Sequence, residues 1–141
     1  MFQYVEVKRL VSNARVPTRN GDTDAGLDLY ALDECTISPG DKAVISTGIA
    51  LAIPEGYVGL IWDRSSMGNK NIHTVGGVID CSYRGEIRVL LFNLGHTQYY
   101  VDAGHKIAQL LIQPVVCCTP VEVAELSATV RGTNGFGSSG V

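Results

Sequence analysis

Short hydrophobic runs, some alternating with polar residues and some continuous, follow one another along most of the chain and are separated by turn residues. We expect strands within residues 42–53, 57–63, 86–93, 98–104 and 105–116, which are bounded by Gly, Asn, Asp or Pro. Only residues 65–70 favour a helical turn, which Ser65 or Ser66 could cap. Many short strands predict an all-β fold, a jelly-roll-like barrel or sandwich.

The composition is typical of a single folded domain of 141 residues, since 45% of the residues are hydrophobic and 18% are charged. A formal net charge of -3 disfavours binding of long nucleic acid by charge alone. No hydrophobic run is long enough for a membrane span, and the charged, alternating N-terminus does not resemble a signal peptide. Four cysteines without a C-x-x-C pair indicate free thiols in a reducing intracellular compartment, cytoplasm or nucleus.

Two loops carry polar residues that could bind a ligand. Asp28 stands between Leu27 and Leu29, so inward packing of both leucines would direct its carboxylate outward, toward solvent or a site. Arg64, Ser65 and Ser66 follow an apolar strand and could bind an anion, although ordinary turns have similar sequences. Trp62 ends that apolar strand, and we expect it in the core.

Two further segments could contribute to chemistry. Residues 75–93 predict a hairpin with its turn at residues 82–85. Asp80 could orient or deprotonate a water there, and Tyr83 offers a flat face to a sugar or ring; a purely structural turn is the alternative. Gln109 interrupts an apolar strand, and a buried amide needs a partner either in the core or on a ligand.

The C-terminal stretch RGTNGFGSSG has four glycines in ten residues yet keeps an arginine and a phenylalanine. A disordered linker explains the glycines but not Phe136. A lid explains both side chains, because Arg131 could meet a phosphate while Phe136 covers an aromatic base. We therefore expect a β domain at residues 1–130 and a mobile arm at 131–141 that completes a site.

Five segments, AGLDLYA, RSSMG, GVIDCSYRGE, GHKIAQL and RGTNGFGSSG, occur in this order. In them the chain resembles the homotrimeric deoxyuridine triphosphatases (dUTPases) from about Asp24 to Gly140. The resemblance implies a jelly-roll-like homotrimer with shared active sites. From the charge and the short hydrophobic runs we expect neither nucleic acid nor a membrane as partner. It also implies Mg²⁺-dependent hydrolysis of dUTP to dUMP and pyrophosphate, which keeps uracil out of DNA and supplies dUMP for thymidylate synthesis.

The resemblance also assigns roles to residues. Asp80 would activate the water that attacks the α-phosphorus, and Tyr83 would lie under the deoxyribose. Asp28 would support the hydration shell of Mg²⁺ through water, with no direct protein ligand to the metal. The phosphate contacts would come from Arg64, Ser65, Ser66 and Gln109. The backbone would approach uracil at Gly77. The closing arm would consist of a catalytic Arg131 together with Phe136, Gly137 and Ser138.

Four positions depart from the usual family pattern: Asp63 replaces Pro, Ser66 replaces Gly, Ser82 replaces Asp and Asn134 replaces Gly. An anion at Asp63 would oppose phosphate binding unless it faces away. Two alternatives to a dUTPase stay open. A dCTP deaminase-type relative has a different turn in place of Tyr83-Arg84-Gly85, and a catalytically silent binding module would be free to lose Asp80 or Arg131.

Overall fold

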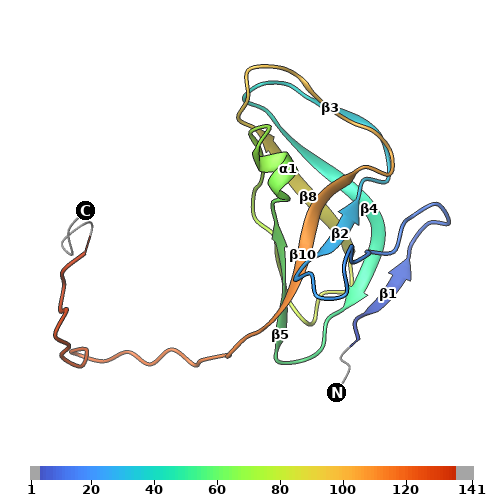
Figure 1. Cartoon of the computed structure of the whole chain (residues 1–141). Helices are drawn as coiled ribbons and strands as arrows, with labels where there is room; N and C mark the ends of the chain where they lie inside the picture. The colour runs from blue at the N-terminus through green and yellow to red at the C-terminus, as the bar shows by residue number, and fades with distance from the viewer. Residues whose placement is uncertain (1–3, 136–141) are drawn as a thin grey trace.

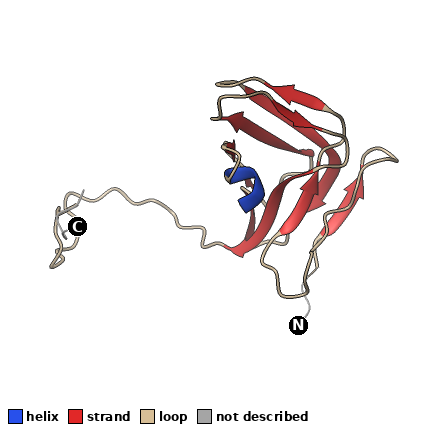
Figure 2. Cartoon of the chain, turned by 45° about the horizontal axis from the view of Figure 1, so that its top comes forward, coloured by secondary structure: helices blue, strands red, loops and turns tan. Residues whose placement is uncertain are grey.

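The computed structural model describes residues 4–135 and consists of antiparallel strands with one four-residue helix among them (Figures 1 and 2). The first four-stranded sheet has the order β1 (Glu6–Arg9), β4 (Lys42–Ala52), β8 (Glu86–Asn93), β6 (Ile72–Thr74). The second has the order β2 (Leu27–Tyr30), β10 (Lys106–Pro114), β5 (Tyr57–Trp62), β7 (Val78–Ile79). A two-stranded sheet pairs β3 (Cys35–Ile37) with β9 (Tyr99–Val101), and the helix is α1 (Ser65–Gly68). The all-β prediction is confirmed.

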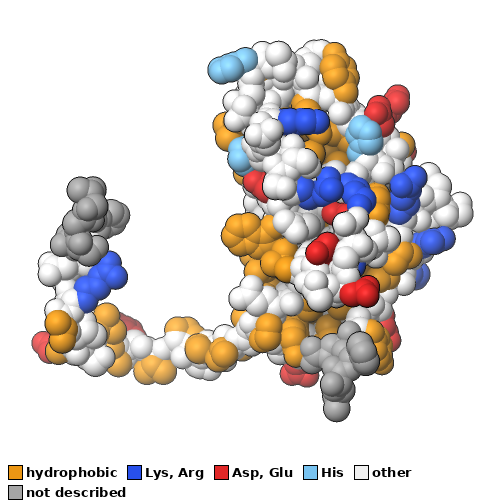
Figure 3. All heavy atoms as spheres, viewed as in Figure 1, with side chains coloured by type: hydrophobic (Ala, Val, Ile, Leu, Met, Phe, Trp, Pro, Cys, Tyr) orange, Lys and Arg blue, Asp and Glu red, His pale blue; other side chains and the backbone are white. Residues whose placement is uncertain are grey.

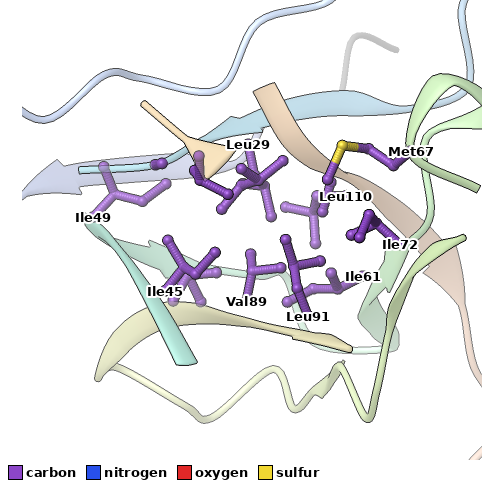
Figure 4. Close-up of a cluster of buried hydrophobic side chains, with 14 of the residues drawn as sticks. Leu29, Ile45, Ile49, Ile61, Met67, Ile72, Val89, Leu91 and Leu110 are labelled. Atoms are coloured by element: carbon purple, nitrogen blue, oxygen red, sulfur yellow. The ribbon is translucent and has the colours of Figure 1, made fainter. Parts of the chain in front are cut away.

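Branched aliphatic side chains from both four-stranded sheets form the core. In β8, Ile87, Val89 and Leu91 are almost fully buried while Arg88 is exposed, the period of two expected for a strand with one covered face. Figure 4 shows Leu29 and Leu110 of the second sheet on the opposite side of the core from Val89 and Leu91. Packing between the sheets therefore fixes the strands from which the loops project.

A β-bulge in β4 is closed by a carboxylate from β8. Gly48 has a φ of 69°, and the pairing of β4 with β8 shifts register between Ser46 and Ala50. Glu86 Oε1 accepts the backbone N–H of Gly48 at 3.0 Å, and Glu86 Oε2 accepts a hydrogen bond from Arg88 Nε at 2.9 Å. Burial raises the pKa of Glu86, but these contacts and the Ser46 hydroxyl outweigh it and hold the pKa below its ordinary value.

Three local predictions are wrong. Residues 75–93 form no hairpin, because β7 pairs with β5 in the second sheet while β8 pairs with β4 and β6 in the first. Trp62 is not a core residue, since its side chain points to the uncovered face of the second sheet and is 56% exposed. Neither Ser65 nor Ser66 caps α1; Arg64 holds the N-cap position and makes no capping hydrogen bond through its side chain.

The last strand ends at Pro114, and residues 113–134 are exposed along a tail that runs away from the sheets (Figure 1). The proposed boundary between residues 1–130 and 131–141 stays a prediction, and Phe136, Gly137 and Ser138 lie outside the described residues.

All four cysteines carry free thiols, as expected. Within residues 4–135, the single helix is far too short to cross a bilayer.

Candidate functional site

A cavity of about 450 Å³ opens on the second sheet, where β2 and β10 meet the loop that contains α1. It is lined by Asn20, Asp24, Ala25, Gly26, Asp28, Arg64, Ser65, Ser66, Lys106 and Gln109. Figure 3 shows Lys and Arg side chains beside acidic ones over this part of the face. The structure thus brings together five residues singled out in the sequence: Asp28, Arg64, Ser65, Ser66 and Gln109.

Asp28 is the centre of the charged cluster in this cavity. Its Oδ1 accepts a hydrogen bond from Arg64 Nε at 2.9 Å, and its Oδ2 lies 2.6 Å from Lys106 Nζ. The carboxylate is only 13% exposed, and Leu29 next to it is fully buried, so Asp28 faces the site rather than open solvent. One carboxylate therefore holds two cations at the cavity wall.

Arg64 keeps donors for a further partner. Its Nη1 donates to the hydroxyl of Ser66 at 3.4 Å and to the carbonyl of Lys106 at 3.3 Å. Within residues 4–135, its Nη2 and the hydroxyl of Ser65 make no hydrogen bond. An anion in the cavity could accept from both groups, and charge-assisted hydrogen bonds of this kind are the strong ones.

Sequence reasoning missed Lys106, and a β-bulge explains why. Residues 106 and 109 have opposite parity, so a regular strand would direct their side chains to opposite faces. The register of β10 against β2 shifts between Lys106 and Ala108, and Ile107 and Ala108 are buried in succession. The bulge therefore lets Lys106 and Gln109 line the same cavity. The sequence did contain one signal for Lys106 as a site residue: it is a lysine next to two apolar residues, in the same segment as Gln109.

Gln109 has a fixed partner and a tight neighbour. Its Nε2 donates to the main-chain carbonyl of Asp63 at 2.7 Å, which answers whether this amide is satisfied within the protein. A Cβ on Gly26 would lie 2.2 Å from Gln109 Oε1. Gly26 is therefore a second residue that sequence reasoning missed: only a glycine leaves room for the glutamine side chain there.

Asp63 faces away from the cavity, which it does not line. Its Oδ1 accepts the backbone N–H of Thr74 at 2.5 Å and the Thr74 hydroxyl at 2.7 Å, and its Oδ2 lies 2.7 Å from His73 Nδ1. Burial raises the pKa of Asp63, but the hydrogen bonds from Thr74 and the contact with His73 outweigh it and lower the pKa overall. The Asp63 carboxylate is thus ionised, but because it faces away it does not oppose the binding of an anion in the cavity.

Asp80 and Tyr83 lie in a second cavity of about 370 Å³, which is separate from the first. It is lined by Val78, Ile79, Asp80, Tyr83, Glu86 and Arg88. The Tyr83 hydroxyl donates to the carbonyl of Glu86 at 3.0 Å, and the backbone N–H of Tyr83 donates to the carbonyl of Asp80 at 3.1 Å. A Cβ on Gly85 would lie 2.4 Å from the Tyr83 hydroxyl oxygen, so Gly85 allows the ring to fold over its own turn.

Gly77 and Arg131 lie outside both cavities. Gly77 has a φ of 113°, and its carbonyl accepts the backbone N–H of Ile61 at 2.8 Å, so this glycine docks the 75–80 segment against β5. Arg131 lies in the tail, where its Nε donates to the carbonyl of Asn134 at 2.9 Å. Of the described residues after Gln109, up to residue 135, none lines the cavity around Arg64. Within residues 4–135, no three His, Cys, Asp or Glu side chains gather as a metal site.

Comparisons with known proteins identify the family. The profile of the dUTPase family matches residues 12–140. The chain belongs to the dUTPase family. It is 43% identical over 136 residues to the probable deoxyuridine 5'-triphosphate nucleotidohydrolase of Schizosaccharomyces pombe, covering 96% of this chain and 97% of that dUTPase.

Solved dUTPases have the same fold. The dUTPase of Staphylococcus bacteriophage 80alpha, solved with dUPNHPP, is 34% identical, with a TM-score of 0.94 over 99% of this chain and 100% of its own. A mutant dUTPase of phage phi11 of S. aureus is 31% identical, with a TM-score of 0.82 over 87% of this chain and 98% of its own, and its structure is described as revealing the coordination of a structural Mg(II) ion. The jelly-roll-like prediction therefore agrees with the dUTPase fold.

Proposed function

We propose that this chain is a dUTP diphosphatase that hydrolyses dUTP to dUMP and pyrophosphate. The observation that carries the proposal is the cavity around Arg64 and Lys106, found in a chain that matches dUTPases over nearly its full length. The reaction keeps uracil out of DNA and supplies dUMP for thymidylate synthesis. Phosphoryl transfer needs positioning and charge neutralisation more than covalent chemistry, and this cavity offers both.

The triphosphate occupies the cavity of the second sheet in this proposal. Arg64 donates through its Nη2, the hydroxyls of Ser65 and Ser66 supply neutral donors, and Lys106 adds a second cation. Gln109 completes the wall through its amide. Asp28 holds Arg64 and Lys106 in the cavity before substrate arrives, so the cations that neutralise the phosphates are already in position. A bound anion then competes with Asp28 for these two cations.

The nucleoside and the attacking water belong to the second cavity. Tyr83 stacks against the deoxyribose, where its ring excludes a 2′-hydroxyl, and the backbone at Gly77 approaches uracil. Asp80 accepts a proton from the water as the water oxygen bonds to the α-phosphorus. The bond from that phosphorus to the bridging oxygen breaks, and pyrophosphate leaves. Asp80 is exposed, as a residue that meets incoming substrate must be.

The donor set fits a magnesium ion that arrives with the substrate. Mg²⁺ keeps several waters and prefers one or two carboxylates together with phosphate oxygens. Asp28 is the carboxylate in the phosphate cavity, and each of its oxygens already accepts from one cation, so support through water is the role that it can play. When bound, the ion would neutralise developing charge on the phosphates.

The proposal includes a homotrimer with shared active sites, and the exposed face of the second sheet supports a partner surface. Gln109 lies directly opposite both Asp28 and Trp62 in the strand register, and Leu60 lies opposite Val78. Phosphate-site and apolar side chains thus share one sheet face, where Trp62 and Val78 are 56% and 69% exposed. Exposed apolar groups of this size favour a partner surface, and a second copy packed there would lie against the phosphate cavity.

The tail completes the site in this proposal. Arg131 contacts the phosphates, while Phe136, Gly137 and Ser138 close over the base and the triphosphate. We also propose a reducing intracellular compartment, which the four free thiols support.

One experiment tests the activity against its nearest alternative. Each of dUTP, dCTP, dTTP and UTP is offered with Mg²⁺, and pyrophosphate and ammonia are measured separately. We expect pyrophosphate from dUTP alone. Ammonia from dCTP would identify a deaminase-type relative, and neither product from any nucleotide would identify a silent binding module.

A further inference from the structure

The Asp63 carboxylate connects the two four-stranded sheets beside the phosphate cavity. Asp63 follows β5 of the second sheet, whereas its hydrogen-bond partners His73 and Thr74 belong to β6, the edge strand of the first. Both carboxylate oxygens are engaged, Oδ1 by two groups of Thr74 and Oδ2 by the ring of His73. A residue that makes three contacts to one strand has little freedom to shift.

The same residue orients two groups of the cavity. The main-chain carbonyl of Asp63 accepts Gln109 Nε2 at 2.7 Å. The next residue is Arg64, whose guanidinium reaches Asp28 at 2.9 Å. Any movement of the Asp63 backbone therefore moves the acceptor of Gln109 and the point from which Arg64 extends.

Among the described residues 4–135, no side-chain hydrogen bond caps the start of α1. The helix has four residues, and its N-cap residue Arg64 makes no capping hydrogen bond through its side chain. A helix end usually gains its order from such a cap. Here the contacts from Asp63 to β6 hold the backbone in place one residue before the N-cap Arg64.

We infer that Asp63 is a positioning residue: its carboxylate, held by His73 and Thr74, fixes the geometry with which Arg64 and Gln109 meet a bound triphosphate. The inference rests on the proposed function, since it assumes that the cavity receives phosphates. Asp63 itself touches no substrate. Its loss should weaken recognition of the outer phosphates while leaving the cavity around Tyr83 unaffected.

The test compares Asp63→Ala, Asp63→Asn and Thr74→Val with Glu55→Ala as a matched control. Glu55 is an exposed carboxylate in the turn before β5, at the opposite end of the same strand. For each variant, calorimetry gives the Kd of the non-hydrolysable triphosphate dUPNHPP and of dUMP, kinetics gives KM and kcat, and a thermal melt gives stability.

We expect Asp63→Ala to raise the triphosphate Kd and the KM for dUTP about ten-fold or more, with dUMP affinity nearly unchanged. Asp63→Asn keeps an oxygen for Thr74 and should restore most of the loss. Thr74→Val removes one of the contacts and should give a smaller effect in the same direction, which keeps the inference testable if Asp63→Ala folds poorly.

Two outcomes would overturn the inference. One is Asp63→Ala and Thr74→Val with the same triphosphate affinity as Glu55→Ala. The other is an equal loss of triphosphate and dUMP affinity that follows the drop in melting temperature, which indicates a general structural role. A wild-type protein that binds dUPNHPP but releases no pyrophosphate from dUTP contradicts the proposed function instead, and leaves the binding comparison of the variants valid.

Discussion

Gly26 shows how one missing side chain can decide the shape of the cavity around Arg64. A methyl group at this position would lie 2.2 Å from Gln109 Oε1, so Gly26→Ala must displace the glutamine. We expect the KM for dUTP to rise about ten-fold with a small change in melting temperature. The control is the same substitution in a Gln109→Ala background, where it should cost much less, because only the 3.0 Å approach to the Cβ of residue 109 remains. Equal effects in both backgrounds would contradict the steric explanation.

Asp80 is the second residue whose role can be separated from folding. Asp80→Asn keeps the size of the side chain and the turn hydrogen bond made by its carbonyl, but it removes the proposed proton acceptor. We expect turnover to fall by about 10²–10⁴-fold with triphosphate binding and assembly retained. Pyrophosphate release and the Kd of dUPNHPP are the two measurements. Unchanged pyrophosphate release would exclude Asp80 as the base.

At this scale the sequence predicted part of the cavity. The alternation Leu27-Asp28-Leu29 correctly directs Asp28 outward, because the side chains of a regular strand alternate between faces. Lys106 could not be placed by the same rule, since the bulge in β10 changes the parity between it and Gln109. Bulges depend on pairing with a distant strand, which local spacing does not reveal.

At the scale of elements, the contact of Glu86 with the bulge of β4 makes the stability of the fold depend on pH. The pKa of Glu86 in the folded protein is lower than its ordinary value of 4.5, so the ionised carboxylate contributes its full stabilisation above pH 4.5. This contribution is lost as the pH falls through the pKa of the folded state. We expect the melting temperature of the wild type to fall more steeply between pH 5 and pH 3 than that of Glu86→Gln. Glu86→Ala should cost about 1.5–3 kcal/mol near pH 7. Parallel pH profiles would exclude this contribution of Glu86.

Element prediction succeeded where hydrophobic runs are long and failed where the partner strand matters. The run at residues 42–53 matches β4, and the run at 86–93 matches β8. The expected hairpin failed because the turn residues 82–85 fit a corner between sheets as well as a hairpin loop. Val78 and Ile79 pair with β5, and only the packed core decides that choice.

At the scale of the whole molecule, the tail should matter for catalysis rather than for folding. Residues 113–134 are exposed and contribute nothing to the core, so truncation after Val130 should leave the thermal melt nearly unchanged. Activity should collapse, because Arg131 and the following residues are lost. Pyrophosphate release and calorimetry on the same sample test this. A melt that falls as far as the rate would make the tail a structural element.

Trp62 shows why assembly was difficult to predict from the sequence. The strand at residues 57–62 is apolar on both faces, and hydrophobicity does not distinguish a face covered by the same chain from one covered by a partner. Ile61 is buried in the core, whereas Trp62 lies outward, opposite Gln109 of the cavity around Arg64. The separation of that cavity from the one around Asp80 points in the same direction, because the proposed site needs residues of both cavities.

Mixed assemblies provide the sharpest test of shared sites. Asp80→Asn damages one cavity and Arg64→Ala damages the other, so each variant alone should be nearly inactive. If a site combines the two cavities from neighbouring chains, random mixing in equal amounts leaves about a quarter of the sites with both residues intact. Refolding the two variants together should therefore restore activity that separate refolding does not. A mixture as inactive as its components would mean that Asp80 and Arg64 serve a site within one chain.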